Sequence, residues 1–284
     1  MHGVVLVQAS GRETYAQERA IMKVEVSLDF LLREWDWGSR IAKCAQLGIE
    51  GVEFPDWSSH DPQLTETLLR KYGVELVVLA GDRWVGDYTN AHVQYSVTDR
   101  RNHECFFRDL DEALNFARAC NVRNVLLDTG DTVAGMRDHE MMRNVVEALA
   151  PAADKVRECG IGVLIEPLNR NEHKGYFLYS IDRAAELVNQ IGTGAKLLVD
   201  IFHSTKEEGT KLPEKLLEHK AHLGEVIHVA DTPHRHEPGT GDIDWSRVMK
   251  AVSDVEFNGW IGLEFVPSKR SEEAITDCRR KLGI

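Results

Sequence analysis

Short runs of β-branched and aliphatic residues recur along the chain and alternate with segments of helical periodicity. The strand-like runs lie near 22–27, 51–54, 74–80, 122–128, 161–168, 196–202, 225–230 and 260–266. Their nearly continuous apolar character is typical of parallel strands that are covered by helices. The intervening helical segments 39–47, 62–72 and 139–159 each stop before a glycine, a residue that favours helix ends. Alternating strands and helices in this number predict a single (β/α)8 TIM barrel.

The domain organisation follows from the length of the chain and the position of its first strand. A length of 284 residues is near the size of one barrel, and no Pro/Ser-rich linker divides it. We expect residues 1–20 to form an N-terminal extension, because they precede the first credible strand, and residues 21–284 to form the barrel domain.

Two connections, 81–104 and 230–244, are longer than a minimal barrel requires. Long loops at the catalytic face commonly form a substrate wall or a lid. The first of them carries Trp84, Tyr88 and Tyr95, whose rings suit either the face of a sugar or packing within the loop. We expect Trp84 to contact substrate.

Charge and cysteine content narrow the class of partner. The chain has 46 acidic against 34 basic residues and a net charge of −12, which disfavours nucleic acid and anionic membrane surfaces. No apolar stretch approaches the roughly 18 residues of a membrane span. The five cysteines form no C-x-x-C pair, as expected for a reducing compartment. We therefore expect a cytoplasmic protein that acts on a small molecule.

Four ligand-type residues each close one of the apolar runs. They are Glu166 after VLI, Asp200 after KLLV, His228 after EVI and Glu264 after IGL, and they are 34, 28 and 36 positions apart. A single glutamate at a strand end is usually a salt-bridge or capping partner. Four such residues on consecutive strands predict a shared site, because the carboxyl ends of barrel strands meet at the active-site mouth.

The residue types indicate which ion this site would hold. Three carboxylates and one imidazole make a mainly oxygen site, which suits a divalent metal ion such as Mn²⁺, Mg²⁺ or Co²⁺, whereas structural zinc sites are richer in Cys and His. Coordination positions would remain for substrate oxygens.

Several strings are similar to those of one known family. IEPLNRNE (165–172), VDIFHS (199–204), HVADTPHRHEPGTGDIDW (228–245) and GWIGLEF (259–265) resemble the xylose isomerase-like TIM barrels, and among them the hydroxypyruvate isomerases. The similarity covers about residues 22–280 and includes GIEGVEF (48–54). The resemblance implies that the protein is an isomerase. Barrels of this family often form dimers or tetramers, and the resemblance extends this expectation to the present chain.

Ketose 3-epimerases of the same superfamily place metal ligands where Glu166, Asp200, His228 and Glu264 stand. The resemblance further implies that the two glutamates perform acid–base work, and that Glu172 and His203 hold substrate hydroxyls. This chain departs from hydroxypyruvate isomerases by carrying His228 where they typically have Gln. It also departs from the epimerases, in the position of the substrate-binding arginine.

The epimerases have a substrate-binding arginine six residues after the histidine ligand, whereas Arg235 lies seven after it. Arg235 suits a carboxylate or a terminal hydroxyl. Glu53 at the end of its strand is expected to contact substrate or support the site. His234 has no role that the sequence assigns.

The chemistry expected of this set is proton transfer next to a carbonyl through an enediolate, with Glu166 and Glu264 as acid and base. One base acting on one face isomerises a small sugar or hydroxy-oxo acid; two bases on opposite faces give a ketose 3-epimerase. An endonuclease IV-like nuclease shares part of the pattern, but its additional histidines have no counterpart at 51–54 or 77–81. A non-catalytic sugar-binding barrel is the remaining alternative.

Overall fold

The computed structural model describes residues 22–85, 92–192 and 194–284. The predicted extension 1–20 and Tyr88 lie outside these residues. The strands are β1 Lys23–Ser27, β2 Gly51–Glu53, β3 Glu75–Ala80, β4 Trp84–Val85, β5 His92–Val93, β6 Asn124–Leu126, β7 Gly162–Ile165, β8 Lys196–Asp200, β9 Leu223–Val229 and β10 Trp260–Leu263. The α-helices are α1 Trp37–Gln46, α2 Pro62–Tyr72, α3 His103–Cys120, α4 Asp138–Glu158, α5 Ile181–Ile191, α6 Ile201–Glu208, α7 Leu212–Glu218, α8 Trp245–Asp254 and α9 Ser271–Leu282. Short 3₁₀ helices are η1 Trp57–Ser59, η2 Arg100–Asn102 and η3 Gly209–Lys211.

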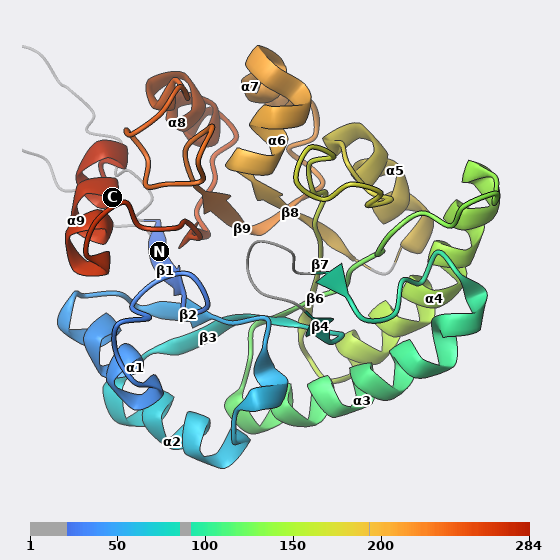
Figure 1. The fold of residues 1–284 in the computed structure, drawn as a ribbon, viewed down its shortest axis with the longest axis horizontal. Helices are drawn as coiled ribbons and strands as arrows, with labels where there is room; N and C mark the ends of the chain where they lie inside the picture. Colours follow the sequence, from blue (N-terminus) through green and yellow to red (C-terminus); the bar gives the residue numbers. More distant parts are fainter. Residues whose placement is uncertain (1–21, 86–91, 193) are drawn as a thin grey trace, which may run out of the picture.

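The eight longer runs form a closed parallel barrel in the order β1-β10-β9-β8-β7-β6-β3-β2. The helices surround it as an outer ring (Figure 1). This arrangement confirms the predicted (β/α)8 barrel, and helix α2 has the predicted bounds. Within the described part of the chain, each helix is too short or too polar to cross a lipid bilayer.

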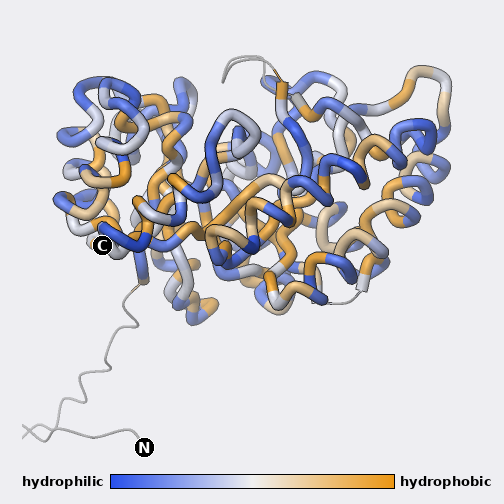
Figure 2. Tube along the Cα trace, turned by 90° about the horizontal axis from the view of Figure 1, so that it is seen from below, coloured by the Kyte–Doolittle hydropathy of each residue, from blue (hydrophilic) through white to orange (hydrophobic). Residues whose placement is uncertain are grey.

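The buried hydrophobic residues form two clusters, one inside the barrel and one outside the strands. A small cluster fills the barrel and consists of Val77, Val78, Leu126, Leu164, Leu198, Val226 and Trp260. A much larger cluster packs the helices against the outside of the strands. Hydrophobic segments accordingly lie toward the interior and hydrophilic ones along the outer faces of the helices (Figure 2). Burial on both faces explains why the strands lack strict alternation.

The structure differs from the sequence analysis in one predicted strand and adds one element that was not predicted. The expected strand 196–202 ends at Asp200, because the carboxylate of Asp200 accepts hydrogen bonds from the backbone of Phe202 (2.7 Å) and His203 (3.4 Å) and caps helix α6. The long connection 81–104 contains the antiparallel pair β4–β5, which was not predicted. Strands of two residues carry too few positions to show a period.

Candidate active site

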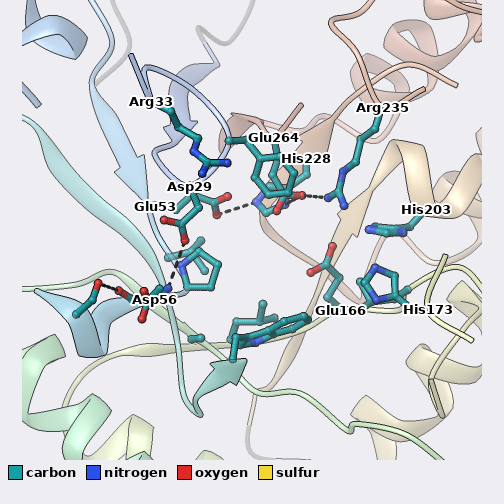
Figure 3. Close-up of a pocket in the computed structure, with 18 of the residues that line it drawn as sticks. Asp29, Arg33, Glu53, Asp56, Glu166, His173, His203, His228, Arg235 and Glu264 are labelled. Carbon is teal, nitrogen blue, oxygen red and sulfur yellow. Dashed lines mark hydrogen bonds and ion pairs between the residues drawn. The ribbon is translucent and has the colours of Figure 1, made fainter. Parts of the chain in front are cut away.

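A cavity of about 460 Å³ opens at the carboxyl ends of the strands. Its lining includes Glu166, His228 and Glu264 on one side and the segments that follow β1 and β2 on the other (Figure 3). Trp84 and Arg235 complete parts of the wall. The cavity therefore lies where the barrel geometry predicts the active site.

The four predicted metal ligands come together, and all of them except the fully buried Asp200 line this cavity. Glu166 directly follows β7, Asp200 ends β8, His228 lies on β9 and Glu264 directly follows β10. One ligand atom from each lies within 4.8 Å of those of the others. The four strands are consecutive neighbours in the barrel, so backbone hydrogen bonds hold the set.

The chemistry of this set fits a divalent cation. Oxygen Oε1 of Glu166 is buried and has no hydrogen-bond partner among the described residues. Burial raises the pKa of Asp200 to about 7, against the opposing effect of Arg235, and burial also raises the pKa of Glu166 well above its usual value. Carboxylates crowded in a low-dielectric site need a positive charge, and a metal ion supplies one.

His228 contributes the only imidazole of the set. Burial favours its neutral form, but the charges of Glu53 and Glu264 outweigh burial and raise its pKa well above the usual value. Because a metal binds the deprotonated nitrogen, coordination by His228 would displace a proton.

The side chain of Arg235 contacts two of the four predicted ligands. Its Nη2 atom contacts Asp200 Oδ2 at 3.2 Å and forms an ion pair with Glu264. The guanidinium stacks over Phe30 and Phe202, with ring centroids 4.7 and 5.2 Å from its carbon. Burial raises the pKa of Glu264, yet Arg235 and His228 reverse this effect and bring that pKa to about 2.

The backbone of Arg235 is strained. Its φ of 56° lies in the left-handed region, which is uncommon for a residue with a Cβ. Its carbonyl accepts a 2.8 Å hydrogen bond from the backbone of Val266. Asp231 holds the rest of the connection by accepting from the backbones of Gly239 and Ile243 and from the indole of Trp245. Connection 230–244 is thus a wall that is fixed by hydrogen bonds.

His203 lies beside the metal-ligand set on α6 and is 2% exposed. Its Nδ1 accepts from the side chain of Asn169 at 2.7 Å, which leaves the proton on Nε2, 3.6 Å from Asp200 Oδ2. Burial and the nearby charge of Arg235 lower the pKa of His203 well below its usual value. His203 is therefore a neutral donor that lines the cavity.

Trp84 is held by a buried carboxylate. Its indole Nε1 donates to Asp128 Oδ2 at 3.0 Å, and the hydroxyl of Tyr176 donates to Asp128 Oδ1 at 2.9 Å. Burial raises the pKa of Asp128 to about 6, and burial together with Asp128 raises the pKa of Asp82 well above its usual value. Through these two hydrogen bonds, Asp128 connects Trp84 of hairpin β4–β5 with Tyr176 in the loop after β7.

Of the remaining residues that the sequence analysis named, one lines the cavity and two do not. Glu53 is 4% exposed and lines the cavity. Glu172 is not among the residues that line the cavity; it forms an ion pair with Lys206 and accepts a 3.2 Å hydrogen bond from Asn169. His234 precedes Arg235 and its ring lies 5.8 Å from that of His236.

The structure adds two residues that sequence reasoning missed. Glu25 is fully buried in the middle of β1, beside His228, and His173 lines the cavity next to His203. A search restricted to strand ends cannot find Glu25. The glutamate in KVEVS was nevertheless a signal, because a charged residue within a buried apolar run requires a partner.

Comparison with known proteins gives a consistent family. The family model described as "Xylose isomerase-like TIM barrel" matches residues 41–281. Hydroxypyruvate isomerase of Escherichia coli (strain K12) is 29% identical over 257 residues, covering 90% of this chain and 97% of that protein. A 2-oxo-tetronate isomerase of Pectobacterium atrosepticum is 27% identical over 257 residues, covering 89% and 95%.

Solved structures share the fold. A Brucella melitensis protein described as "AP endonuclease, family 2" superposes with a TM-score of 0.81 at 24% identity, over 90% of this chain and 97% of its own. D-psicose 3-epimerase of Clostridium cellulolyticum H10, solved with D-tagatose, gives a TM-score of 0.73 at 19% identity, over 92% and 99%. The family model extends over most of the barrel, and we conclude that the chain belongs to the xylose isomerase-like TIM barrel family.

Proposed function

We propose that the protein is a divalent-metal-dependent isomerase of a small hydroxy-oxo acid or sugar. The observation that carries the proposal is the convergence of Glu166, Asp200, His228 and Glu264, with ligand atoms within 4.8 Å, at a cavity of about 460 Å³. The curated relatives with isomerase names support the same reaction class. A cavity of this size suits a small substrate.

The reaction requires removal of a proton from the carbon next to a carbonyl and its return to the neighbouring carbon. A divalent cation held by the four ligands would supply Lewis-acid stabilisation of the negative charge that develops on the substrate oxygens. Glu166 and Glu264 are the proposed acid and base, because both project into the cavity from opposite ends of the row of four strands.

Two further groups of the chain would orient the substrate. The Nε2–H of His203 can donate to a substrate oxygen, because its Nδ1 is already engaged by Asn169. The guanidinium of Arg235 offers a planar set of donors for a carboxylate or hydroxyl beside the metal ligands. Trp84 lines one side of the cavity and would contact the substrate there.

A ketose 3-epimerase is the second candidate. It is favoured by one observation, namely that Glu166 and Glu264 both face the cavity and come from separate strands. Bases on both faces of a planar enediolate would invert the carbon, whereas one base would move the carbonyl.

Proton–deuterium exchange in heavy water tests both candidates. The protein would be incubated with hydroxypyruvate, tartronate semialdehyde and a panel of ketoses, with Mg²⁺ and then with EDTA, and followed by NMR. We expect deuterium at the carbon beside the carbonyl, lost on chelation, and its position distinguishes isomerisation from epimerisation. Exchange that persists in EDTA would refute the metal-dependent mechanism.

Substitution tests the assignment of acid and base. Glu166→Gln and Glu264→Gln should each abolish turnover while circular dichroism shows an intact fold. Glu214→Gln is the matched control, because Glu214 lies exposed on α7 in an ion pair with Arg247 and should retain wild-type turnover. Retained turnover in both site variants would refute the assignment.

A further inference from the structure

A second pair of carboxylates lies on the far side of His228 from the metal ligands. The Nε2 atom of His228 is 3.0 Å from Glu53 Oε2 and 3.8 Å from Glu25 Oε1. Its Nδ1 atom is 3.4 Å from Glu264 Oε2. The imidazole therefore has one nitrogen toward the metal-ligand set and the other toward Glu25 and Glu53 (Figure 3 shows Glu53 and His228).

Both side chains are buried: Glu25 is 0% exposed and Glu53 is 4% exposed. Neither carboxylate oxygen of Glu25 has a hydrogen-bond partner among the described residues. Burying a carboxyl group without a hydrogen-bond partner is unfavourable in either protonation state. A residue type so unfavourable in the barrel interior indicates a function other than packing.

The barrel makes room for this contact with a glycine. In the strand register Glu25 on β1 pairs with Gly262 on β10, and Gly262 pairs with His228 on β9. Glu25 and His228 are thus two strands apart and their side chains meet over Gly262. A Cβ at Gly262 would lie 2.5 Å from His228 Cδ2 and 2.9 Å from Glu25 Oε1.

The consequence for His228 follows from imidazole chemistry. A ligating nitrogen must carry a lone pair, so the other ring nitrogen carries the proton and needs an acceptor. Carboxylates commonly serve as that acceptor, which fixes the ring orientation and raises the basicity of the ligating nitrogen. Here the acceptor side is occupied by Glu53 at hydrogen-bonding distance, with Glu25 next to it.

We propose that Glu25 and Glu53 are positioning residues: Glu53 receives the Nε2–H of His228 when Nδ1 binds the metal, and the neighbouring Glu25 supports this orientation of the ring. The inference rests on the metal site of the proposed function. It assigns Glu25, which is neither a lining residue of the cavity nor one of the four predicted ligands, a role in metal affinity rather than in substrate contact.

The test measures Mn²⁺ affinity in the purified full chain, by the electron paramagnetic resonance signal of free Mn²⁺. Glu25→Met and Glu53→Met keep side-chain length and remove the acceptor, and each should weaken Mn²⁺ binding about 10–100-fold, the usual effect of losing such a partner. Glu53→Gln keeps an acceptor oxygen and should recover part of the loss. Glu225→Gln, at the opposite end of β9 in an ion pair with Arg123, is the matched control and should bind as wild type does.

Thermal unfolding of the metal-free variants separates positioning from a general structural role. Glu25→Met removes a buried carboxyl group that has no hydrogen-bond partner among the described residues, so its metal-free midpoint should equal or exceed that of the wild type while Mn²⁺ affinity falls. Glu53→Met also removes the ion-pair partner of His228, so its metal-free midpoint should fall. Wild-type affinity in both Met variants would overturn the inference and leave the proposed function standing. A wild-type protein that binds no Mn²⁺ would overturn both.

Discussion

Gly262→Ala probes the space between Glu25 and His228 with a single methyl group. The added Cβ would lie 2.5 Å from His228 Cδ2 and 3.1 Å from its Nε2, well inside van der Waals contact. Because both neighbours belong to rigid strands, they cannot move aside freely. Overpacking of this kind destabilises by about 1–3 kcal/mol, which lowers the unfolding midpoint by roughly 2–10 °C in a protein of this size.

The displaced imidazole should also bind metal less well. Calorimetry of the metal-free protein gives the stability change, and Mn²⁺ titration gives the change in affinity, which we expect to exceed tenfold. Gly38→Ala is the control, because a Cβ there meets no atom closer than 3.7 Å and lies in helix α1, where alanine is favoured by about 0.5–1 kcal/mol. If Gly262→Ala matched this control in midpoint and affinity, the steric reasoning would be wrong.

Three further predictions concern the metal, a buried carboxylate and the cavity wall. Mg²⁺ or Mn²⁺ at 100 times its dissociation constant should stabilise the fold by about 2.7 kcal/mol, and EDTA should reverse the shift in a thermal scan; no shift with either ion would contradict the site. The raised pKa of Asp128, about 6, means that its ionisation destabilises the fold as pH rises from about 4 to above 6. The unfolding free energy of Asp128→Asn, measured in urea, should therefore rise relative to that of the wild type over this pH range, by up to roughly 3 kcal/mol. A difference in unfolding free energy that does not change with pH would refute the raised pKa of Asp128. Trp84→Phe should raise KM several-fold with a smaller change in kcat, whereas an unchanged KM would remove Trp84 from the substrate wall.

The barrel and the clustering of the four predicted ligands were predictable because both depend on short-range patterns. Continuous apolar runs mark parallel strands, and a polar residue directly after such a run must project from the carboxyl end of the barrel. Glu166, Asp200, His228 and Glu264 each satisfy this rule, and the structure brings them together. Strand ends were less predictable, since a side chain that caps a helix, as Asp200 does, ends the strand without changing its apolar pattern.

Residues whose environment depends on distant strands were not predictable in the same way. Glu25 meets His228 only because β1 and β9 flank the glycine of β10, a relation that arises when the barrel closes. The ion pair between Glu172 and Lys206 of α6 likewise depends on how the loop after β7 packs against that helix. The sequence shows neither closure nor such pairing, because both depend on how helices and strands pack.

The four predicted ligands and the opposite side of the cavity come from different halves of the barrel. Strands β7 to β10 carry the four ligands, whereas the segments after β1 and β2, with Asp29, Arg33 and His60, form much of the opposite side of the cavity. Mutations at the carboxyl ends of β7 to β10 would be constrained by one reactive centre, whereas mutations in the loops after β1 and β2 would change the cavity wall without changing the four predicted ligands. Descendants of such a chain could therefore acquire new substrates by exchanging two loops while inheriting the same reaction.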